Sequence, residues 1–515
     1  MFIKIFLLLL FFAVTILVGI YFRKRALNVN DFVLGGRNVG PWLSAFSYGA
    51  TYFSAVVFVG YAGQFGWRFG TAAVWIGLGN AFIGSLMAWF ILGRRTRVMT
   101  HHLKSATMPE FFNSRYVSSA LKIGASIIIF IFLIPYTASL YNGLSRLFSM
   151  AFGVPFEYCI IAMGILTAVY VVLGGYFATA VNDFIQGTIT IIGVIAIIAV
   201  VLKNNGGFTQ AVDTLARVND SNVSLSPGAF TSFFGPDPIN LLGVVILTSL
   251  GAWGLPQMVA RFYSIKSETM ISKGAIVSTI FAILVAGGCY FLGSFGRLYT
   301  DVVERGANGT VIFDSIIPTI LSGFPEAMMG LIVVLVFAAS ISTLSSLVMA
   351  SASTLTLDFL RGHIVKKMSD KSQLFIIRSL IVVFIIISSV IAIFQYKGGI
   401  TFIAQLMGVS WGALAGSFLA PFLYGLYWKR ASKISVWCCF IFSTVLMTGN
   451  VLFRSAFPAI LQSPINAGAF CMLAGLIIVP LVSAVTKAPG EETIAHCFSC
   501  YEETITVKLK DDLGN

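Results

Sequence analysis

The sequence predicts an all-α membrane protein with about thirteen transmembrane helices. Of its 515 residues, 57% are hydrophobic and only 10% are charged, whereas average soluble domains carry about 25% charged residues. Apolar windows of about 20 residues, long enough to span the hydrocarbon core, recur from one end of the chain to the other. Polar stretches separate these windows, as is typical of a polytopic protein.

The first expected helix covers residues 2–22. Basic residues follow it and no small-residue cleavage site is present, so we interpret it as a retained membrane helix and not as a signal peptide. Ten core helices and two trailing helices follow. The core helices are expected at 40–66, 69–93, 119–150, 155–173, 178–202, 238–262, 272–296, 327–354, 374–396 and 401–427. The trailing helices are expected at 434–453 and 466–486.

The formal net charge of +13 could indicate a nucleic-acid partner, but the distribution of the charge argues against one. If the helices alternate in direction, most basic loop residues fall on one side of the cell membrane. By the positive-inside rule that side is cytoplasmic, which places the N-terminus outside and the C-terminus in the cytoplasm. The basic residues expected there are Arg23, Lys24, Arg25, Arg94, Arg95, Arg97, Lys104, Arg115, Arg261, Lys266, Arg361, Lys366, Lys367, Lys371, Lys429, Arg430 and Lys433.

Two of the expected helices are interrupted by glycine and proline. The first core helix contains Gly-Ala-Thr-Tyr-Phe-Ser at 49–54, and the sixth contains Gly-Ala-Trp-Gly-Leu-Pro at 251–256. Glycine and proline are frequent in membrane helices, so either interruption alone says little. The two fall at equivalent places if the ten helices form two sets of five, and such a pair indicates a transporter site within an inverted repeat.

This pairing divides the chain into six segments. They are a leading helix with a cytoplasmic loop at 1–39, a first inverted repeat at 40–202, an extracellular loop at 203–237, a second inverted repeat at 238–427, trailing helices at 428–487 and a cytoplasmic tail at 488–515. The tail contains His496, Cys497 and Cys500, which supply at most half of a zinc site. We therefore expect a reduced tail without structure.

Hydroxyl side chains crowd one face of the eighth core helix. Ala339, Ser342, Thr343 and Ser346 follow the spacing i, i+3, i+4, i+7 and therefore share that face. Such hydroxyls commonly bond to the carbonyl one turn earlier in their own helix, or pack as small residues between helices. Beside an interrupted helix with free carbonyls, they would instead complete an oxygen shell for a small hard cation such as sodium.

Asp183 is a lone carboxylate near the beginning of a strongly apolar helix. At the centre of a membrane helix an aspartate costs about 2.5–3.5 kcal/mol, so such a residue is expected to line an ion pathway. The alternative is an N-cap, because aspartate is common at the start of a helix and costs less near the interface. The local sequence leaves both interpretations open.

Four stretches, spread over most of the chain, share a pattern with known transporters. They are 30–37, 174–176 together with 183–186, 254–257 together with Arg261, and 339–358. At these positions the chain resembles the sodium:solute symporter family, which includes bacterial proline and pantothenate symporters and the sodium/glucose cotransporters. The resemblance implies a LeuT-like fold of five plus five helices, with one leading and two trailing helices.

The resemblance also implies sodium sites. A main site would use the backbone carbonyls of Ala50, Phe53 and Ala339 and the hydroxyls of Ser342 and Thr343. A second site, present in some members, would use Asp183, Ser342, Ser345 and Ser346. The resemblance therefore implies coupling to one or two sodium ions.

The resemblance says less about the solute. Proline symporters carry an aspartate at the position of Tyr52 and aromatic residues at those of Thr248 and Ala252. No buried cation is evident in the expected pocket, so a half-helix N-terminus would meet any carboxylate. The candidate solute-binding residues are Tyr52, Ser54, Trp75, Asn80, Tyr136, Thr248, Trp253 and Gln405. The aromatic ones are equally typical of helix packing.

Together these features predict a sodium-coupled symporter that takes up an amino acid or a carboxylate by alternating access. Its partners would be sodium, the solute and the lipid bilayer, with no nucleic acid and no obligatory protein partner. A sodium-dependent solute sensor and a channel are the alternatives, although the sequence contains no output domain and no filter motif. An enzyme is not expected, because no Ser/His/Asp set, metal cluster or phosphate loop is evident.

Overall fold

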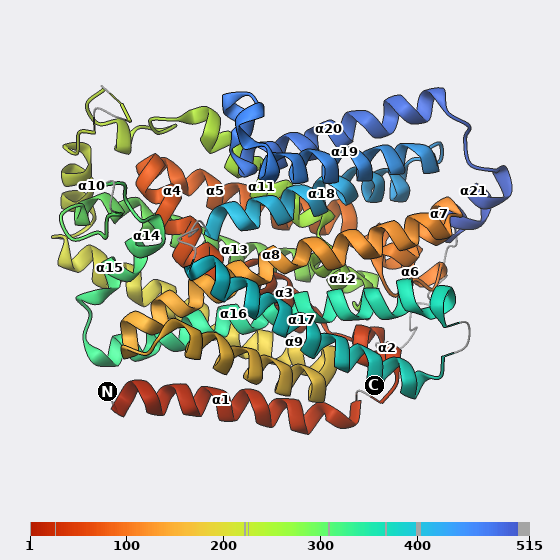
Figure 1. Ribbon diagram of the computed structural model, residues 1–515, viewed down its shortest axis with the longest axis horizontal. Helices are drawn as coiled ribbons and strands as arrows, with labels where there is room; N and C mark the ends of the chain where they lie inside the picture. Colours follow the sequence, from red (N-terminus) through yellow and green to blue (C-terminus); the bar gives the residue numbers. More distant parts are fainter. Residues whose placement is uncertain are drawn as a thin grey trace, which may run out of the picture.

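Long helices run side by side along the longest axis of the molecule (Figure 1). The structure is a computed structural model that describes residues 2–25, 27–220, 223–224, 226–306, 309–365, 368–397 and 403–502. Lys366, Lys367 and the tail beyond residue 502 therefore lie outside the described residues. Within the described ranges no β-strand forms, and extended pairing is limited to isolated bridges. The all-α class predicted from composition is confirmed.

The bundle has an α15 end and an α7 end, which lie at the left and the right of Figure 1. The short helices α15 (Ile316–Ser322) and α7 (Met108–Tyr116) mark them. The leading helix α1 (Phe2–Phe22) begins at the α15 end and runs along the outside of the bundle to the α7 end.

Basic loops that are far apart in the sequence meet at the α7 end. Arg97 Nε donates to the carbonyl of Ile265 at 2.9 Å, and Arg115 Nη2 donates to the carbonyl of Trp428 at 2.9 Å. These contacts join the loop after the second core helix to the loops after the sixth and the tenth. Three of the loops that carry the expected basic residues therefore meet at the α7 end.

The first core helix is broken where the sequence predicts an interruption. α3 (Pro41–Tyr52) ends at Phe53, whose backbone is extended with φ −98° and ψ 127°. The chain resumes as a π-helical turn at Val56–Tyr61 and continues into α4 (Ala62–Phe69). Because the last carbonyls of a helix have no amide partner further along it, the break leaves acceptor groups inside the bundle.

The sixth core helix is broken as well. α11 (Pro238–Gly254) and α12 (Pro256–Tyr263) meet at Leu255, which is extended with φ −82° and ψ 122°. Their axes differ by 45°. Pro256 is the first residue of α12, a position where its missing N–H breaks no helical hydrogen bond. Both predicted interruptions are thus confirmed.

The number of spans stays a prediction. Ten helices in the described ranges are long and apolar enough to cross a membrane, and the bent pair α11–α12 makes eleven. Two of the ten are long continuous helical stretches, residues 56–102 and α9 (Phe156–Asn204). Each of them contains a glycine with a positive φ. The φ values are 59° at Gly70 and 60° at Gly175. Dividing both runs at these glycines would give the predicted thirteen.

α16 (Glu326–Thr354) is the central helix of the bundle. In its most apolar window 94% of the residues are buried, and it packs against α1, α3, α8 and α9. Its serines, alanines and threonines allow the neighbouring backbones to approach closely.

The other helices are α2 (Val29–Leu34), α5 (Val74–Gly79), α6 (Arg94–His102), α8 (Ser119–Phe152), α10 (Phe208–Ala216), α13 (Ile271–Ala282), α14 (Gly288–Ser294), α17 (Asp370–Lys397), α18 (Ile403–Tyr427), α19 (Lys433–Leu452) and α20 (Pro464–Val485).

The tail is structured as far as residue 502, which differs from the expectation. α21 (Glu491–Phe498) lies at the α7 end, and Cys497 is buried there. The guanidinium carbon of Arg95 lies 4.1 Å from the ring centre of Tyr427 and 4.5 Å from that of Tyr501. These cation–π contacts hold the tail against α6 and the end of α18. The packing partners are distant in the sequence, so the tail alone does not reveal them.

Candidate ion and solute site

Backbone carbonyls at the break of the first core helix face the hydroxyl-rich side of α16. Thr343 Oγ1 lies 3.4 Å from the carbonyl oxygen of Ala50 and 3.3 Å from that of Phe53. It lies 3.2 Å from the carbonyl oxygens of both Thr51 and Ala339. Four carbonyl oxygens therefore converge on one buried hydroxyl.

Ser342 extends this arrangement. Its Oγ lies 3.1 Å from the carbonyl oxygen of Ala50 and 2.9 Å from that of Ala339. The residues that the family resemblance implies for the main sodium site therefore lie together, and Thr51 adds a carbonyl that was not among them. We call the whole group the Thr343 cluster. It consists of Ala50, Thr51, Phe53, Ala339, Ser342 and Thr343.

The Thr343 cluster has more hydrogen-bond acceptors than donors. A hydroxyl carries one hydrogen, so Thr343 satisfies at most one of the four carbonyl oxygens around it at a time. The remaining oxygens direct negative partial charge toward the same buried point. A small hard cation that prefers oxygen ligands matches this arrangement.

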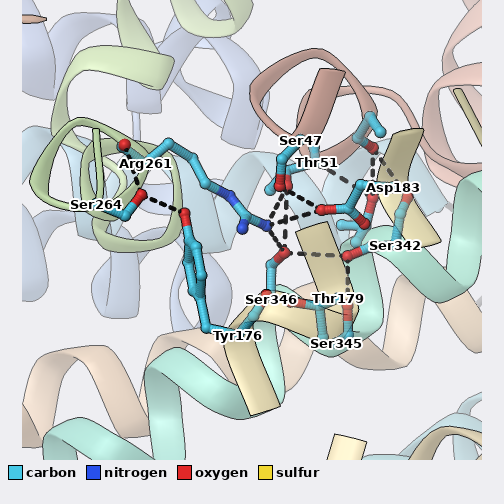
Figure 2. A network of polar contacts seen from close by, with 12 residues as sticks. Ser47, Thr51, Tyr176, Thr179, Asp183, Arg261, Ser264, Ser342, Ser345 and Ser346 are labelled. Carbon is cyan, nitrogen blue, oxygen red and sulfur yellow. Dashed lines mark hydrogen bonds and ion pairs between the residues drawn. The ribbon is translucent and has the colours of Figure 1, made fainter. Parts of the chain in front are cut away.

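A second polar network lies beside the Thr343 cluster (Figure 2). Asp183 is fully buried and accepts a hydrogen bond from the hydroxyl of Ser47. Its Oδ2 also lies 3.4 Å from Nη2 of Arg261, which forms a buried ion pair. Within α9, Asp183 follows the break at Gly175 by about two turns. It does not cap a helix, so the N-cap interpretation is wrong.

Arg261 points into the middle of this network (Figure 2). Its Nη2 donates to Thr51 Oγ1 at 2.7 Å and to the hydroxyl of Ser346. The side chain thereby links α12 to α3, α9 and α16. The expectation that Arg261 is a loop cation is wrong, because only 2% of the residue is exposed. A buried carboxylate such as Asp183 requires a cationic partner. This requirement could have identified Arg261 as the partner of Asp183 from the sequence.

Ser345 and Ser346 border the network, but their hydroxyls bond within α16. Ser345 Oγ donates to the carbonyl of Ser342 at 2.8 Å, and Ser346 Oγ donates to the same carbonyl at 3.0 Å. Arg261 connects Ser346 to Asp183. The residues implied for a second sodium site are therefore neighbours, and a guanidinium supplies the positive charge at their carboxylate.

Three aromatic rings gather beside the break in the first core helix. The ring of Trp411 lies 5.9 Å from that of Tyr52 and 6.0 Å from that of Tyr136, measured between centroids. Tyr136 also lies close to Ser54. In the described part of the chain, the Ser54 hydroxyl and the Trp411 indole N–H lie beside the Tyr136 hydroxyl and make no other hydrogen bond. Apolar ring faces beside this small group of hydroxyl and N–H groups suit a small polar solute.

Trp411 was not among the predicted solute residues, since no sequence signal distinguishes it from other aromatic residues. Thr248 and Trp253 were among the predicted solute-binding residues, but their polar groups form hydrogen bonds within the protein. The hydroxyl of Tyr52 donates to the carbonyl of Thr248. Trp253 Nε1 donates to the carbonyl of Ile83 at 2.9 Å. Thr248 therefore holds the Tyr52 hydroxyl, and the Trp253 indole N–H is used by the backbone of Ile83.

Three further candidates stand outside the aromatic group. Trp75 Nε1 donates to the carbonyl of Phe233 at 2.9 Å, so its indole packs against the loop that precedes α11. Asn80 Oδ1 accepts from the hydroxyl of Ser249 at 3.3 Å. Gln405 is half-buried in the first turn of α18. Of the predicted solute residues, the structure groups Tyr52, Ser54 and Tyr136 most closely.

The profile of the sodium:solute symporter family matches residues 32–437, which is most of the chain. The chain belongs to the sodium:solute symporter family. The resemblance drawn from the four sequence stretches is therefore confirmed. The similar proteins are transporters and not enzymes, in agreement with the sequence-based expectation.

Two relatives align over most of their length. The osmoregulated proline transporter OpuE of Bacillus subtilis (strain 168) is 27% identical over 485 residues, which cover 94% of each chain. A sodium/proline symporter of Staphylococcus aureus (strain JH9) is 29% identical over 437 residues, which cover 82% of each chain. This chain is therefore similar to transporters along almost its whole length.

Solved structures show the same fold. A Na+-coupled sialic acid symporter in a substrate-bound outward-open state has a TM-score of 0.74 at 19% identity, covering 95% of this chain and 99% of that one. Mhp1, a nucleobase-cation-symport-1 family transporter, has a TM-score of 0.51 at 15% identity, covering 90% of this chain and 97% of that one. The LeuT-like fold implied by the sequence is confirmed, and the protein is a multi-pass membrane transporter.

Proposed function

We propose that this symporter takes up a small amino acid together with sodium, and that the Thr343 cluster is its main sodium site. The family supports sodium-coupled symport in general. The observation that carries the ion assignment is the convergence of four carbonyl oxygens on Thr343 Oγ1. The proposed ligands are the carbonyls of Ala50, Phe53 and Ala339 and the hydroxyls of Ser342 and Thr343.

The position of the cluster suggests how the ion and the solute are coupled. Ala50 and Phe53 lie at the break in the first core helix, and Tyr52 and Ser54 of the same break border the aromatic group. A sodium ion would tie this break to α16 and fix the adjoining solute pocket. Coupling then requires that sodium favours one conformer over the other.

The energy available from one ion is sufficient for concentrative uptake. One sodium ion entering down a potential of about 100 mV releases about 2.3 kcal/mol. A tenfold sodium gradient adds about 1.4 kcal/mol. The sum could sustain about a 500-fold gradient of a neutral or zwitterionic solute, and a second ion would square that ratio.

A second sodium site is proposed at Asp183, with the hydroxyls of Ser342, Ser345 and Ser346. Arg261 stands at this carboxylate in the structure, 3.4 Å from its Oδ2. Two cations beside one buried carboxylate would repel each other strongly. We therefore propose that the guanidinium of Arg261 must move away when a second sodium ion binds.

The proposed topology follows from the distribution of charge. Basic loops gather at the α7 end, which we assign to the cytoplasm, and the α15 end with the N-terminus faces outward across the cell membrane. The proposed segments are the leading helix and loop (1–39), two inverted repeats (40–202 and 238–427), the extracellular loop between them (203–237), the trailing helices (428–487) and the cytoplasmic tail (488–515).

The proposed solute is a small zwitterionic amino acid, and L-proline is the first candidate. The names of the two relatives, a proline transporter and a sodium/proline symporter, support this choice. The group of Tyr52, Tyr136 and Trp411 offers apolar ring faces to a compact side chain. Tyr52 replaces the aspartate of proline symporters, so the solute range should be measured and not taken from the relatives.

The deciding experiment is uptake of radiolabelled solutes into proteoliposomes, with an inward sodium gradient compared with an equal potassium gradient. The panel contains L-proline, other small amino acids, monocarboxylates, pantothenate and sugars. Sodium-dependent accumulation of an amino acid is expected. If sodium raises the melting temperature while no member of the panel accumulates, the proposed amino-acid solute is contradicted, and a solute outside the panel or a sodium-dependent sensor gains support, because stabilisation requires only binding.

A further inference from the structure

A cavity of about 300 Å³ lies at the α7 end, where the chain leaves α20 and enters α21 (Figure 1). One wall is the end of α7, with Tyr116 and Val117. The other walls are the beginning of α19 and the chain between α20 and α21. Neither the Thr343 cluster nor the aromatic group contributes a residue to its lining. The proposed symport therefore does not account for this cavity.

Two lysine residues, Lys433 and Lys487, line this cavity. Both are exposed, and neither forms an ion pair with a carboxylate in the described part of the chain. The acidic residues closest to Lys487 in the sequence are Glu491 and Glu492, in the first turn of α21. Both are exposed and lie outside the lining. The described lining thus carries two positive charges and no carboxylate.

Hydrogen bonds between the start of α19 and the end of α20 place the two lysines side by side. Ser432 Oγ and Thr486 Oγ1 lie 2.8 Å apart, and each of these residues directly precedes one of the lysines. The backbone N–H of Ser432 also donates to Ser483 Oγ at 3.1 Å. These contacts fix the backbone next to both lysines before a ligand arrives. Such pre-organisation lowers the entropic cost of binding.

The cavity lies at a membrane boundary. Lys433 is the first residue of α19, and Lys487 follows the last residue of α20 by two positions. Both helices are long and apolar enough to cross a membrane, and in their most apolar windows only 39% of the residues are buried. Two exposed apolar residues, Val117 and Ile434, line the cavity together with the lysines. Positive charge and accessible apolar surface therefore occur at the same depth.

This combination favours one class of anion. Free phosphate would use the lysines alone, whereas a phospholipid can place its phosphate at the lysines and its acyl chains along the exposed surface of α19. Basic residues next to membrane helices attract anionic lipids, and a lysine ammonium binds phosphate as a point charge. A zwitterionic headgroup carries an additional cation, which both lysines would repel. Single lysines at helix ends commonly extend to the interface without a specific ligand, but here two lysines from different helices line one cavity.

We propose that this cavity binds the headgroup of an anionic phospholipid, with the phosphate between Lys433 and Lys487. Pro489, Gly490 and Thr493 of the tail complete the lining, so a bound lipid would contact the tail as well as the trailing helices. In the proposed topology this end faces the cytoplasmic leaflet. The binding site itself does not depend on that orientation or on the identity of the solute.

Lipid binding to the purified full-length protein in detergent tests the proposal, with native mass spectrometry as the readout. Dioleoyl phosphatidylglycerol is compared with dioleoyl phosphatidylcholine, which has the same acyl chains and no net charge. The wild type should bind phosphatidylglycerol about tenfold more tightly, or better. Lys433→Gln and Lys487→Gln should each weaken this binding about fivefold, and the double variant about 25-fold.

Controls separate a defined site from general attraction to a basic surface. The double variant Lys433→Arg with Lys487→Arg keeps both charges and should bind phosphatidylglycerol at least as tightly as the wild type. Lys266→Gln removes an exposed lysine that does not line the cavity, from another loop at the same end, and should leave binding unchanged. Inorganic phosphate at millimolar concentration should not displace the lipid. Unchanged melting temperatures establish that the variants are folded.

The proposal is overturned if the wild type binds the two lipids equally, or if the double glutamine variant binds phosphatidylglycerol as tightly as the wild type. Equal weakening by Lys266→Gln would indicate diffuse attraction to the basic surface and would overturn the defined site. Displacement of the lipid by inorganic phosphate would indicate a site for free anions and would overturn the headgroup assignment. None of these outcomes depends on sodium-driven uptake, so failure of the proposed symport is detected separately.

Discussion

Removal of the Thr343 hydroxyl should weaken sodium binding while the fold is preserved. Thr343 Oγ1 lies within 3.4 Å of four carbonyl oxygens, so a sodium ion in their midst would have this hydroxyl as a direct ligand. An interaction of a hydroxyl with a charged group contributes about 1.5–3 kcal/mol. Thr343→Ala should therefore raise the sodium concentration for half-maximal binding about 10- to 150-fold.

Two matched variants separate loss of the ligand from loss of packing. Thr343→Ser keeps the oxygen and removes only a methyl group, so sodium affinity should stay close to that of the wild type. Ser340→Ala removes a hydroxyl from the same helix, but that hydroxyl donates to the carbonyl of Val336 at 2.6 Å in its own helix. Ser340→Ala should leave sodium binding unchanged.

The assay is the rise in melting temperature of purified protein as sodium replaces potassium, because a ligand that binds only the folded state stabilises it by mass action. Half-maximal sodium concentrations for uptake into proteoliposomes give an independent value. If Thr343→Ala shows the same sodium dependence as the wild type in both assays, the Thr343 cluster is not the sodium site.

Three further changes test neighbouring features. Asp183→Asn should lower the number of charges moved per solute molecule if a second sodium ion binds there. An unchanged ratio of current to solute flux would indicate that the Asp183 carboxylate serves only as the ion-pair partner of Arg261. Arg261→Gln should destabilise the protein by about 3–5 kcal/mol, because it leaves a buried carboxylate unpaired. Sodium should then stabilise this variant more than the wild type, and an equal effect would argue against competition between guanidinium and sodium. A methyl group at Gly66 would overlap the carbonyl of Gly293. Gly66→Ala should therefore destabilise the contact between α4 and α14 by about 1–3 kcal/mol, whereas Gly323→Ala, in open space, should leave thermal unfolding unchanged.

Local sequence predicted the features that depend only on neighbouring residues. Apolar windows of sufficient length define membrane helices because the backbone must satisfy its own hydrogen bonds in lipid. Glycine and proline at equivalent places in the two repeats indicated the breaks at Phe53 and Leu255, since these residue types weaken a helix interior. The shared face of Ser342, Thr343 and Ser346 follows from helical spacing alone. The family resemblance added which carbonyls should face them.

Contacts between distant elements required the tertiary structure. Thr343 reaches the carbonyl of Phe53, which is 290 positions away in the sequence. The sequence predicts Arg261 to be a loop cation at the end of an interrupted helix. In the structure it is buried against Asp183.

The sequence by itself determined the membrane class, the broken helices and the family, because these depend on composition, spacing and local motifs. Only the tertiary structure decided that Asp183 pairs with Arg261 and that Trp411 joins Tyr52 and Tyr136. The physical reason is that the partner of a buried charge or ring is selected by how helices pack, and no local pattern in the chain records that packing.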